Sequence, residues 1–367
     1  MWSWKLARVA GIDVHMHATF LLLVAWVALS HWAAEQSVAA VVAGVAFILA
    51  LFACVVLHEF GHALTARKYG IKTRDITLLP IGGVARLERM PDEPMQELWV
   101  ALAGPAVNVV IAAALFGWMA TTNGLEPLTR LSVTSGPFLE RLMYVNVFLV
   151  AFNLLPAFPM DGGRVLRALL ATRMEYTRAT QTAAQIGQGM ALLFGFLGLI
   201  GNPFLLFIAL FVWIGAAQEA SMVQMKSALA GIPVRRAMIT DFRTLSPHDD
   251  LDHAVELLIT GTQKDFPVVD EGRVVGLLLH ADLPAALARG GRSAPVVDVM
   301  RRDFETVDSH EMLEIAFRRL QACECHAVAV LRHGQLVGLV TMDNVGEFLS
   351  VQAALGEHGR DPTRRAA

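Results

Sequence analysis

The stretch CVVLHEFGHAL, residues Cys54–Leu64, places two histidines and a glutamate at the end of a long apolar run. That run begins at Val38, and a helix needs about 20 mostly apolar residues to cross a membrane. On a helix, His58 and His62 share one face, and Glu59 lies next to them. This H-E-x-x-H pattern supplies two imidazoles for a zinc ion and a carboxylate that takes a proton from water. An ionisable residue deep in a bilayer costs about 3 kcal/mol or more, which favours a functional role over polar residues at a helix end.

The composition divides the 367 residues into an apolar part and a mixed part. Long apolar runs continue to about Gln218, and after Lys226 the chain has the charged, mixed composition of a soluble domain. Overall, 55% of the residues are hydrophobic, 17% are charged, and the mean hydropathy is +0.50. A net charge of −3 gives no reason to expect nucleic acid as a partner. The three cysteines give no disulfide framework, and we interpret them as packing residues: Cys54, Cys323 and Cys325.

Six segments are apolar and long enough, or nearly so, to span a membrane. They are Ala18–Ala34, Val38–Leu57 with a polar extension, Leu98–Ala120, Phe138–Leu155, Ala183–Ile200 and Pro203–Ala217. The first run also resembles a signal peptide, because Lys5 and Arg8 precede it. It has no obvious cleavage site, and its loss would invert the charge pattern of the loops. We therefore predict a mainly α-helical, multi-pass domain in the cell membrane.

The charges between these segments predict their orientation, because cytoplasmic loops carry an excess of Lys and Arg. With a cytoplasmic N-terminus, the outside segments hold only Arg130 and Arg141. The inside segments hold Lys5, Arg8, Arg67, Lys68, Lys72, Arg74, Arg86, Arg89, Arg164, Arg167, Arg173, Arg178, Lys226, Arg235 and Arg236. This asymmetry predicts that both termini and the C-terminal part lie in the cytoplasm.

A catalytic zinc ion needs a third protein ligand and an open position for water. The best candidate is Asp161, in NLLPAFPMDGGRVL, where Pro156 and Pro159 end the fourth apolar helix. Asp161 can also serve simply as the N-terminal cap of the helix that follows. The residues alone leave both interpretations open.

Four motifs together resemble the site-2 protease family of intramembrane zinc metalloproteases. HEFGH matches the family's first motif and NLLPAFPMDGGR its N-x-x-P-x-x-x-x-D-G motif. GPAVN, Gly104–Asn108, matches a third signature, and LPIGGVARLE, Leu79–Glu88, resembles a re-entrant β-segment. The resemblance covers residues 10–220, with the motifs in the family's order.

The resemblance implies a role for several residues. His58, His62 and Asp161 would bind one Zn²⁺, and Glu59 would be the catalytic base. Asn153 and Asn108 are implied candidates for holding the substrate backbone or the developing oxyanion. An extended substrate would pair with the strand edge around residues 81–86, where two glycines suit a tight turn, Gly82 and Gly83. The implied substrates are transmembrane proteins, such as a membrane-bound anti-sigma factor or a similar signalling protein, cleaved among membrane lipid.

The part after Lys226 repeats itself at an offset of 62 residues without gaps. Met238 pairs with Met300, for example, and Gly276 with Gly338. Each copy reads as strand, helix, hairpin and helix, which resembles a tandem pair of CBS domains. Such pairs regulate or dimerise their hosts and often bind an adenine nucleotide through a Gly, a hydroxyl and an Asp. Each motif is incomplete here, and its candidate nucleotide-binding residues are Asp282, Thr341 and Asp343.

These observations predict four regions: a membrane protease domain at 1–222, CBS domains at 226–289 and 294–355, and a disordered tail at 356–367. We expect regulated proteolysis within the membrane, with the α/β CBS pair as a regulatory or homodimerising module. Two alternatives remain: a CBS-regulated membrane metal transporter or metal sensor, and an inactive scaffold. Glu59 separates the protease from the transporter or sensor, because a transporter does not need a carboxylate directly after the first histidine and a hydrolase does. The scaffold ranks last, because all the catalytic residue types are present.

Overall fold

The computed structural model divides the chain into two compact units, Met1–Val223 and Gln224–Ala367. It describes residues 3–80, 82–91, 93–122, 136–323 and 327–358. Three predictions fall partly outside these ranges: the outside charge Arg130, the packing role of Cys325 and the tail from 359 onward. The first three residues predicted as tail, 356–358, are helical instead, because the last helix extends to His358.

The first unit contains seven helices among its described residues. They are α1 (Ala18–Glu35), α2 (Val38–Lys68), α3 (Pro94–Thr122), α4 (Phe138–Asn153), α5 (Asp161–Ala171), α6 (Tyr176–Ile200) and α7 (Phe204–Leu229), which continues into the second unit.

Five of these helices, α1, α2, α3, α6 and α7, are long and apolar enough to cross a membrane. The sixth predicted span corresponds to α4, which has only 16 residues and falls short of that length. Large apolar side chains on these helices point outward: Trp26 is 66% exposed and Phe207 is 70% exposed. Helices that are apolar on all sides and little buried are typical of contact with lipid.

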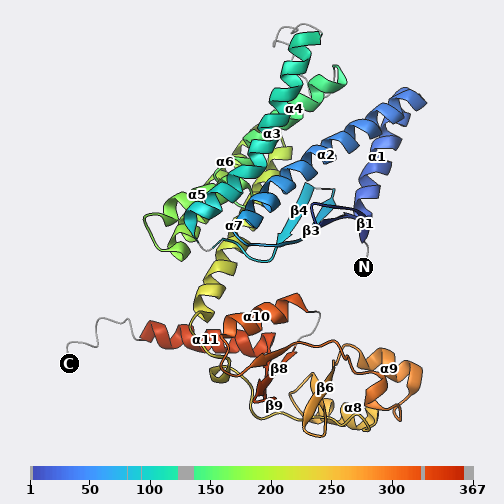
Figure 1. The fold of residues 1–367 in the computed structure, drawn as a ribbon, viewed down its shortest axis with the longest axis vertical. Coiled ribbons are helices and arrows are strands. Elements are labelled where there is room, and N and C mark those ends of the chain that lie inside the picture. Colours follow the sequence, from blue (N-terminus) through green and yellow to red (C-terminus); the bar gives the residue numbers. More distant parts are fainter. Residues whose placement is uncertain (1–2, 81, 92, 123–135, 324–326, 359–367) are drawn as a thin grey trace, which may run out of the picture. The chain divides into compact units, whose positions relative to one another are not determined.

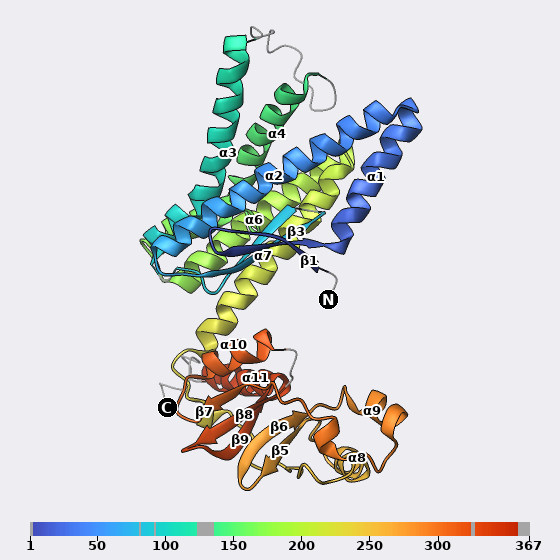
Figure 2. The ribbon, with the colours of Figure 1, turned by 45° about the vertical axis from the view of Figure 1, so that its right-hand side comes forward.

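A four-stranded sheet lies beside α2 (Figures 1 and 2). Its strand order is β1 (Ser3–Val9), β2 (Ile12–His17), β3 (Thr73–Leu79) and β4 (Gly82–Leu87). The outer pairs are antiparallel, whereas β2 and β3 are parallel and are separated in sequence by α1 and α2. Buried residues of the sheet pack against the second half of α2, namely Ile12, Val14 and Ile76 against Phe60 and Ala63. The sheet therefore lies against the part of α2 that carries the HEFGH motif.

A buried charge cluster joins α3, α5 and α7. The side chain of Arg167 on α5 is completely buried and forms hydrogen-bonded ion pairs with Glu97 of α3 and Glu219 of α7. Its guanidinium also lies 5.0 Å from the ring centroid of Phe158 and 5.1 Å from that of Tyr176. From the sequence alone, Arg167 counts among the loop charges on the inside. In the structure it is instead a buried residue that holds α5 against α3 and α7.

The second unit repeats its elements along the chain. The first copy contains η2 (Val234–Arg236), α8 (Leu251–Thr260), β5 (Phe266–Asp270), β6 (Arg273–Leu278) and α9 (Leu283–Gly290). The second contains η3 (Val296–Asp298), β7 (Thr306–Asp308), α10 (Leu313–Ala322), β8 (Ala327–Arg332), β9 (Gln335–Thr341) and α11 (Met342–His358). The predicted first strand of copy one is reduced to a single parallel bridge between Leu245 and Val268. Each copy has its own buried apolar core.

Candidate metal centre and active site

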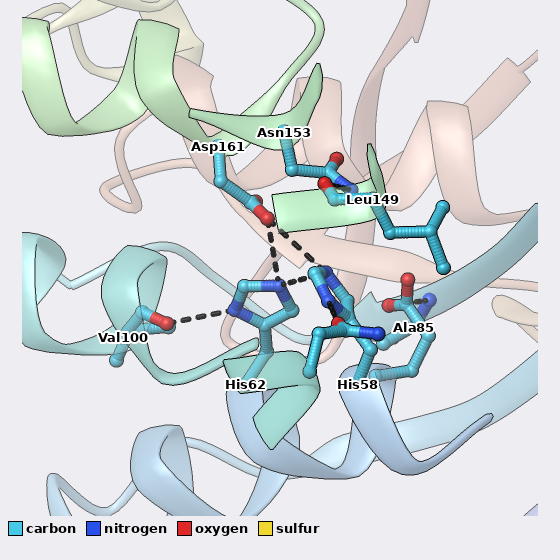
Figure 3. A network of polar contacts seen from close by, with 9 residues as sticks. His58, His62, Ala85, Val100, Leu149, Asn153 and Asp161 are labelled. Atoms are coloured by element: carbon cyan, nitrogen blue, oxygen red, sulfur yellow. Dashed lines mark hydrogen bonds and ion pairs between the residues drawn. The ribbon is translucent and has the colours of Figure 1, made fainter. Parts of the chain in front are cut away.

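Three side chains from two helices meet inside the first unit. Asp161, the first residue of α5, places Oδ2 3.2 Å from Nε2 of His58 and 3.1 Å from Nε2 of His62. The two Nε2 atoms are 3.1 Å apart, and all three residues are buried. Figure 3 shows the carboxylate of Asp161 pointing toward both rings. Among the described residues, this is the group of His, Cys, Asp and Glu side chains that could hold a metal ion.

The donor atoms fit a zinc ion. Two imidazole nitrogens and one carboxylate oxygen form a nearly equilateral triangle, as found for three ligands of a catalytic site that keeps one position open. Ligand atoms at about 2.0–2.1 Å from a tetrahedral zinc ion lie about 3.3–3.4 Å from one another, close to the distances here. The residues present therefore suit the metal that their types predict.

Each histidine is oriented through its other ring nitrogen. Nδ1 of His62 lies 2.7 Å from the backbone carbonyl of Val100, and Nδ1 of His58 lies 2.5 Å from Oδ1 of Asn108. Both acceptors come from α3. Metal-ligating histidines almost always donate this second N–H to an oxygen, which turns the lone pair of the opposite nitrogen toward the metal.

Gly104 leaves the space in front of the two rings open. A Cβ atom at this position would lie 2.2 Å from Nε2 of His62 and 2.6 Å from Nε2 of His58. Gly104 is the first residue of the GPAVN motif, but nothing in the sequence pattern predicts that it lies at the site. The structure brings α3 so close to α2 here that only a residue without a side chain fits.

Glu59 lies on the side of α2 that faces the sheet. Its Oε2 accepts a hydrogen bond of 3.1 Å from the backbone N–H of Ala85 in β4. Gly83 of the same strand is in close contact, since a Cβ there would lie 2.9 Å from Cγ of Glu59. The two glycines predicted for the turn, Gly82 and Gly83, lie in β4 instead, and Gly83 pairs with Leu78. The close approach of β4 to Glu59, rather than the turn, requires the glycine at 83.

The remaining candidates of the first unit have different surroundings. Asn153 ends α4 near Asp161 (Figure 3), and its Nδ2 donates to the carbonyl of Leu149 at 2.9 Å. Asn108 is completely buried, and both polar atoms of its amide are engaged within the protein. Its partner is Asn146, a buried residue that lies outside the four sequence motifs. Its position in the sequence could have indicated a role, because Asn146 is a lone amide in the apolar run YVNVFLV.

Cys54 lies one turn before His58 and is buried among apolar side chains. Its neighbours are Phe47, Leu142 and Val145, as expected of a small packing residue. Cys323 is half-buried beside Leu277 and Leu279 of the second unit.

The three nucleotide-motif candidates of the second unit are held by neighbouring groups. Asp282 accepts two hydrogen bonds from Arg301, at 2.7 and 3.0 Å, and this ion pair holds the pKa of Asp282 below its ordinary value. Asp343 forms an ion pair with Lys264 at 2.8 Å, and Oγ1 of Thr341 accepts a hydrogen bond from the backbone N–H of Asn344. Each of the three candidate side chains is therefore engaged by another group of the chain itself.

Comparison with known proteins identifies both units. The model of peptidase family M50 matches residues 46–135 and 129–194, and the CBS domain model matches residues 234–289 and 296–350. Zinc metalloprotease MJ0392 of Methanocaldococcus jannaschii is 32% identical over 358 residues, which are 95% of this chain and 97% of that protein. The chain belongs to peptidase family M50. Rip3 of Mycobacterium tuberculosis is 28% identical over 371 residues, covering 94% of this M50 chain and 92% of Rip3. The solved site-2 protease from Methanocaldococcus jannaschii is 38% identical, with a TM-score of 0.44, and covers 60% of this chain and 95% of that one.

Membership in family M50 confirms the resemblance to site-2 proteases. The match to the CBS domain model confirms the prediction of a CBS pair. This M50 member is a zinc metalloprotease and a multi-pass membrane protein. The finding does not favour the alternative of a metal transporter or sensor, because the relative that matches along almost its full length is named a zinc metalloprotease.

Proposed function

We propose that His58, His62 and Asp161 hold the zinc ion of this protease and that Glu59 is its catalytic base. The observation that carries this proposal is the triangle of three donor atoms with sides of 3.1–3.2 Å, next to a glutamate on the same helix. A histidine pair that only transports a metal ion does not need that glutamate, whereas a hydrolase needs it as a base.

When bound, zinc lowers the pKa of water and polarises the scissile carbonyl. Glu59 takes the proton of the attacking water and delivers it to the leaving amine. Oε2 of Glu59 is held by the N–H of Ala85, which leaves Oε1 for this proton. Burial of the three donor residues keeps bulk water away from the site, and this strengthens every electrostatic interaction there. Asn153 is the candidate for holding the oxyanion or the substrate backbone.

The substrate is a transmembrane segment that unwinds locally, because a helical peptide bond has its carbonyl engaged and shielded. β4 supports binding of such an extended segment: within the described sheet it is an outer strand, paired only with β3. The N–H of Ala85 points to Glu59 and not to β3, so the alternation of an antiparallel ladder turns the N–H of Gly83 outward as well. A substrate strand added to this edge would run past the catalytic base.

The charge asymmetry of the loops supports an orientation with β1 and the CBS pair in the cytoplasm. HEFGH lies near the end of α2 that carries Arg67 and Lys68, so the site opens toward the cytoplasmic side of the membrane. Natural substrates in this proposal are single-pass signalling proteins, such as a membrane-bound anti-sigma factor.

The CBS pair serves in this proposal as a regulatory or homodimerising module, with the limits 226–289 and 294–355. An adenine nucleotide remains part of the proposal only as an effector, and no step of the reaction passes through it. Equilibrium binding of ATP, ADP and AMP to the full chain tests this role. Saturable binding that is weakened by Asp282→Ala or Thr341→Val supports it, and the absence of saturable binding for all three nucleotides rules it out.

A cleavage assay tests the proposed protease. The wild type and the Glu59→Gln variant are each co-expressed with candidate single-pass membrane proteins, and zinc content is measured on the same preparations. We expect Glu59→Gln to keep zinc and lose cleavage by about 10²–10⁴-fold, the range of general acid–base catalysis. Glu88→Gln makes the same chemical change at an exposed residue next to β4 and should cleave like the wild type. Equal cleavage by wild type and Glu59→Gln would remove Glu59 from the mechanism.

A further inference from the structure

A chain of buried hydrogen bonds runs from His58 across three helices. Nδ1 of His58 on α2 lies 2.5 Å from Oδ1 of Asn108 on α3. Nδ2 of Asn108 donates to Oδ1 of Asn146 on α4 at 2.8 Å, and Nδ2 of Asn146 donates to the backbone carbonyl of Leu142 at 2.8 Å. Both asparagines have no exposed surface.

This chain has only one consistent direction, and the carbonyl of Leu142 sets it. A backbone carbonyl only accepts hydrogen bonds, so Asn146 must turn its NH₂ group toward Leu142 and its oxygen toward Asn108. Asn108 must then turn its NH₂ group toward Asn146 and its oxygen toward His58. The proton of a neutral His58 is therefore on Nδ1, and Nε2 carries the lone pair that faces Asp161.

His62 reaches the same state more directly, because its Nδ1 contacts the carbonyl of Val100 itself. His58 contacts a side-chain amide, and the two ends of an amide have nearly the same shape. Without Asn146, the amide of Asn108 can rotate by half a turn and present its NH₂ group to Nδ1. The proton of His58 would then move to Nε2, and the ring would lose the nitrogen that faces the metal position.

The cost of burying Asn146 also indicates a role for it. It lies between Val145 and Val147 in a short apolar helix, and a buried amide contributes little to stability beyond satisfying its own hydrogen bonds. Leucine has a similar size and would fit the apolar surroundings. An amide at this position instead serves its two partners, the buried NH₂ group of Asn108 and the carbonyl of Leu142.

We propose that Asn146 is a positioning residue of the zinc site, which fixes the amide of Asn108 and through it the tautomer of His58. The inference rests on the proposed zinc ligands. It predicts that removing Asn146 weakens zinc binding although Asn146 touches none of the three ligands.

A double-mutant cycle tests this coupling. Zinc affinity is measured by competition with a chelator on the detergent-solubilised full chain, for wild type, Asn146→Leu, Asn108→Leu and the double variant. We expect Asn146→Leu to lower the affinity about 10–100-fold, the usual cost of losing a group that orients a metal ligand. In the Asn108→Leu background the same change should have no further effect, because Asn146 acts through Asn108. Thr180→Val is the matched control, since Thr180 is equally buried and also bonds the carbonyl four residues before it.

The outcomes separate this inference from the proposed function. A wild type that binds no zinc would overturn the zinc site itself. A wild type that binds zinc, with Asn146→Leu unchanged or equally weakened in both backgrounds, would overturn only the role of Asn146. A second measurement determines the tautomer in the wild type itself, by ¹⁵N NMR of the histidine-labelled, zinc-free protein. The His58 signals are assigned by comparison with His58→Gln. We expect the Nδ1–H tautomer of neutral His58, and finding Nε2–H would contradict the proposal.

Discussion

The backbone N–H of Ala85 donates a 3.1 Å hydrogen bond to Oε2 of Glu59 and so connects an outer strand of the sheet to the proposed catalytic base. The two residues are far apart in the chain and come from a strand and a membrane helix. The bond holds one carboxylate oxygen and leaves the other available for a proton. The strand that we propose to receive the substrate therefore also orients the base.

Replacing Ala85 by proline removes this N–H, because proline has no backbone donor. Proline is tolerated on an outer strand where the N–H faces away from the sheet. A hydrogen bond to a charged group is worth about 1.5–3 kcal/mol, so we expect cleavage to fall about 10–100-fold with zinc content unchanged. Ala85→Ser keeps the N–H and should cleave like the wild type. Full activity of Ala85→Pro would remove both the orientation of Glu59 and the substrate strand from our proposal.

Gly104→Ala should abolish or strongly weaken zinc binding. Its new methyl group would lie 2.2 Å from Nε2 of His62, so either the ring or helix α3 has to move. We expect at least about a tenfold loss of zinc affinity, as for other changes that displace a ligand. Gly117→Ala on the same helix is the control, because a Cβ there has nothing within 4 Å. Equal zinc affinity in both variants would contradict the packing of α3 against the site.

Arg167→Met should destabilise the first unit. The substitution leaves Glu97 buried without its partner, and breaking a buried ion pair in this way costs about 3–5 kcal/mol. Adding Glu97→Gln should recover part of the loss, because the remaining group is then uncharged. Arg173→Met, at an exposed position just after α5, should change the unfolding free energy by less than about 0.5 kcal/mol. Unfolding of the full chain in mixed micelles measures these values, and equal effects of the two Arg→Met variants would refute the buried cluster.

Asp282→Asn should show a pH-dependent loss of stability in the second unit. Arg301 lowers the pKa of Asp282 in the folded chain, so the pair stabilises the fold above the ordinary carboxyl pKa. This stabilisation is lost as the pH falls through the folded-state pKa and Asp282 becomes protonated. Both side chains are about one-third exposed, and we expect a difference of about 0.2–1 kcal/mol at pH 7 that disappears in acid. Scanning calorimetry of the full chain measures it, with the exposed Asp270→Asn as control; a loss that persists in acid would contradict the ion pair.

The sequence predicted what depends on local pattern. The apolar runs predicted α1, α2, α3, α6 and α7, and the HEFGH motif predicted a histidine pair on one face of a membrane helix. The repeat predicted the CBS elements, since α8 and α10 begin at the paired residues Leu251 and Leu313.

What the sequence did not predict depends on contacts between distant segments. The parallel pairing of β2 and β3 joins strands separated by a helical hairpin, and no local signal specifies it. Arg167 looks like any loop cation until Glu97 and Glu219 are placed beside it. Asn146 matters only because the packing of three helices aligns two amides between His58 and a carbonyl.

X-ray absorption at the zinc edge of the detergent-solubilised full chain tests the proposed metal site most directly. We predict one zinc ion per chain with two imidazole nitrogens and carboxylate or water oxygens, all at about 2.0–2.2 Å. Asp161→Ala and His62→Ala should each reduce the bound zinc, whereas Cys54→Ala should leave the spectrum unchanged. A sulfur ligand at about 2.3 Å, or full zinc occupancy with an unchanged spectrum in Asp161→Ala, would contradict the site.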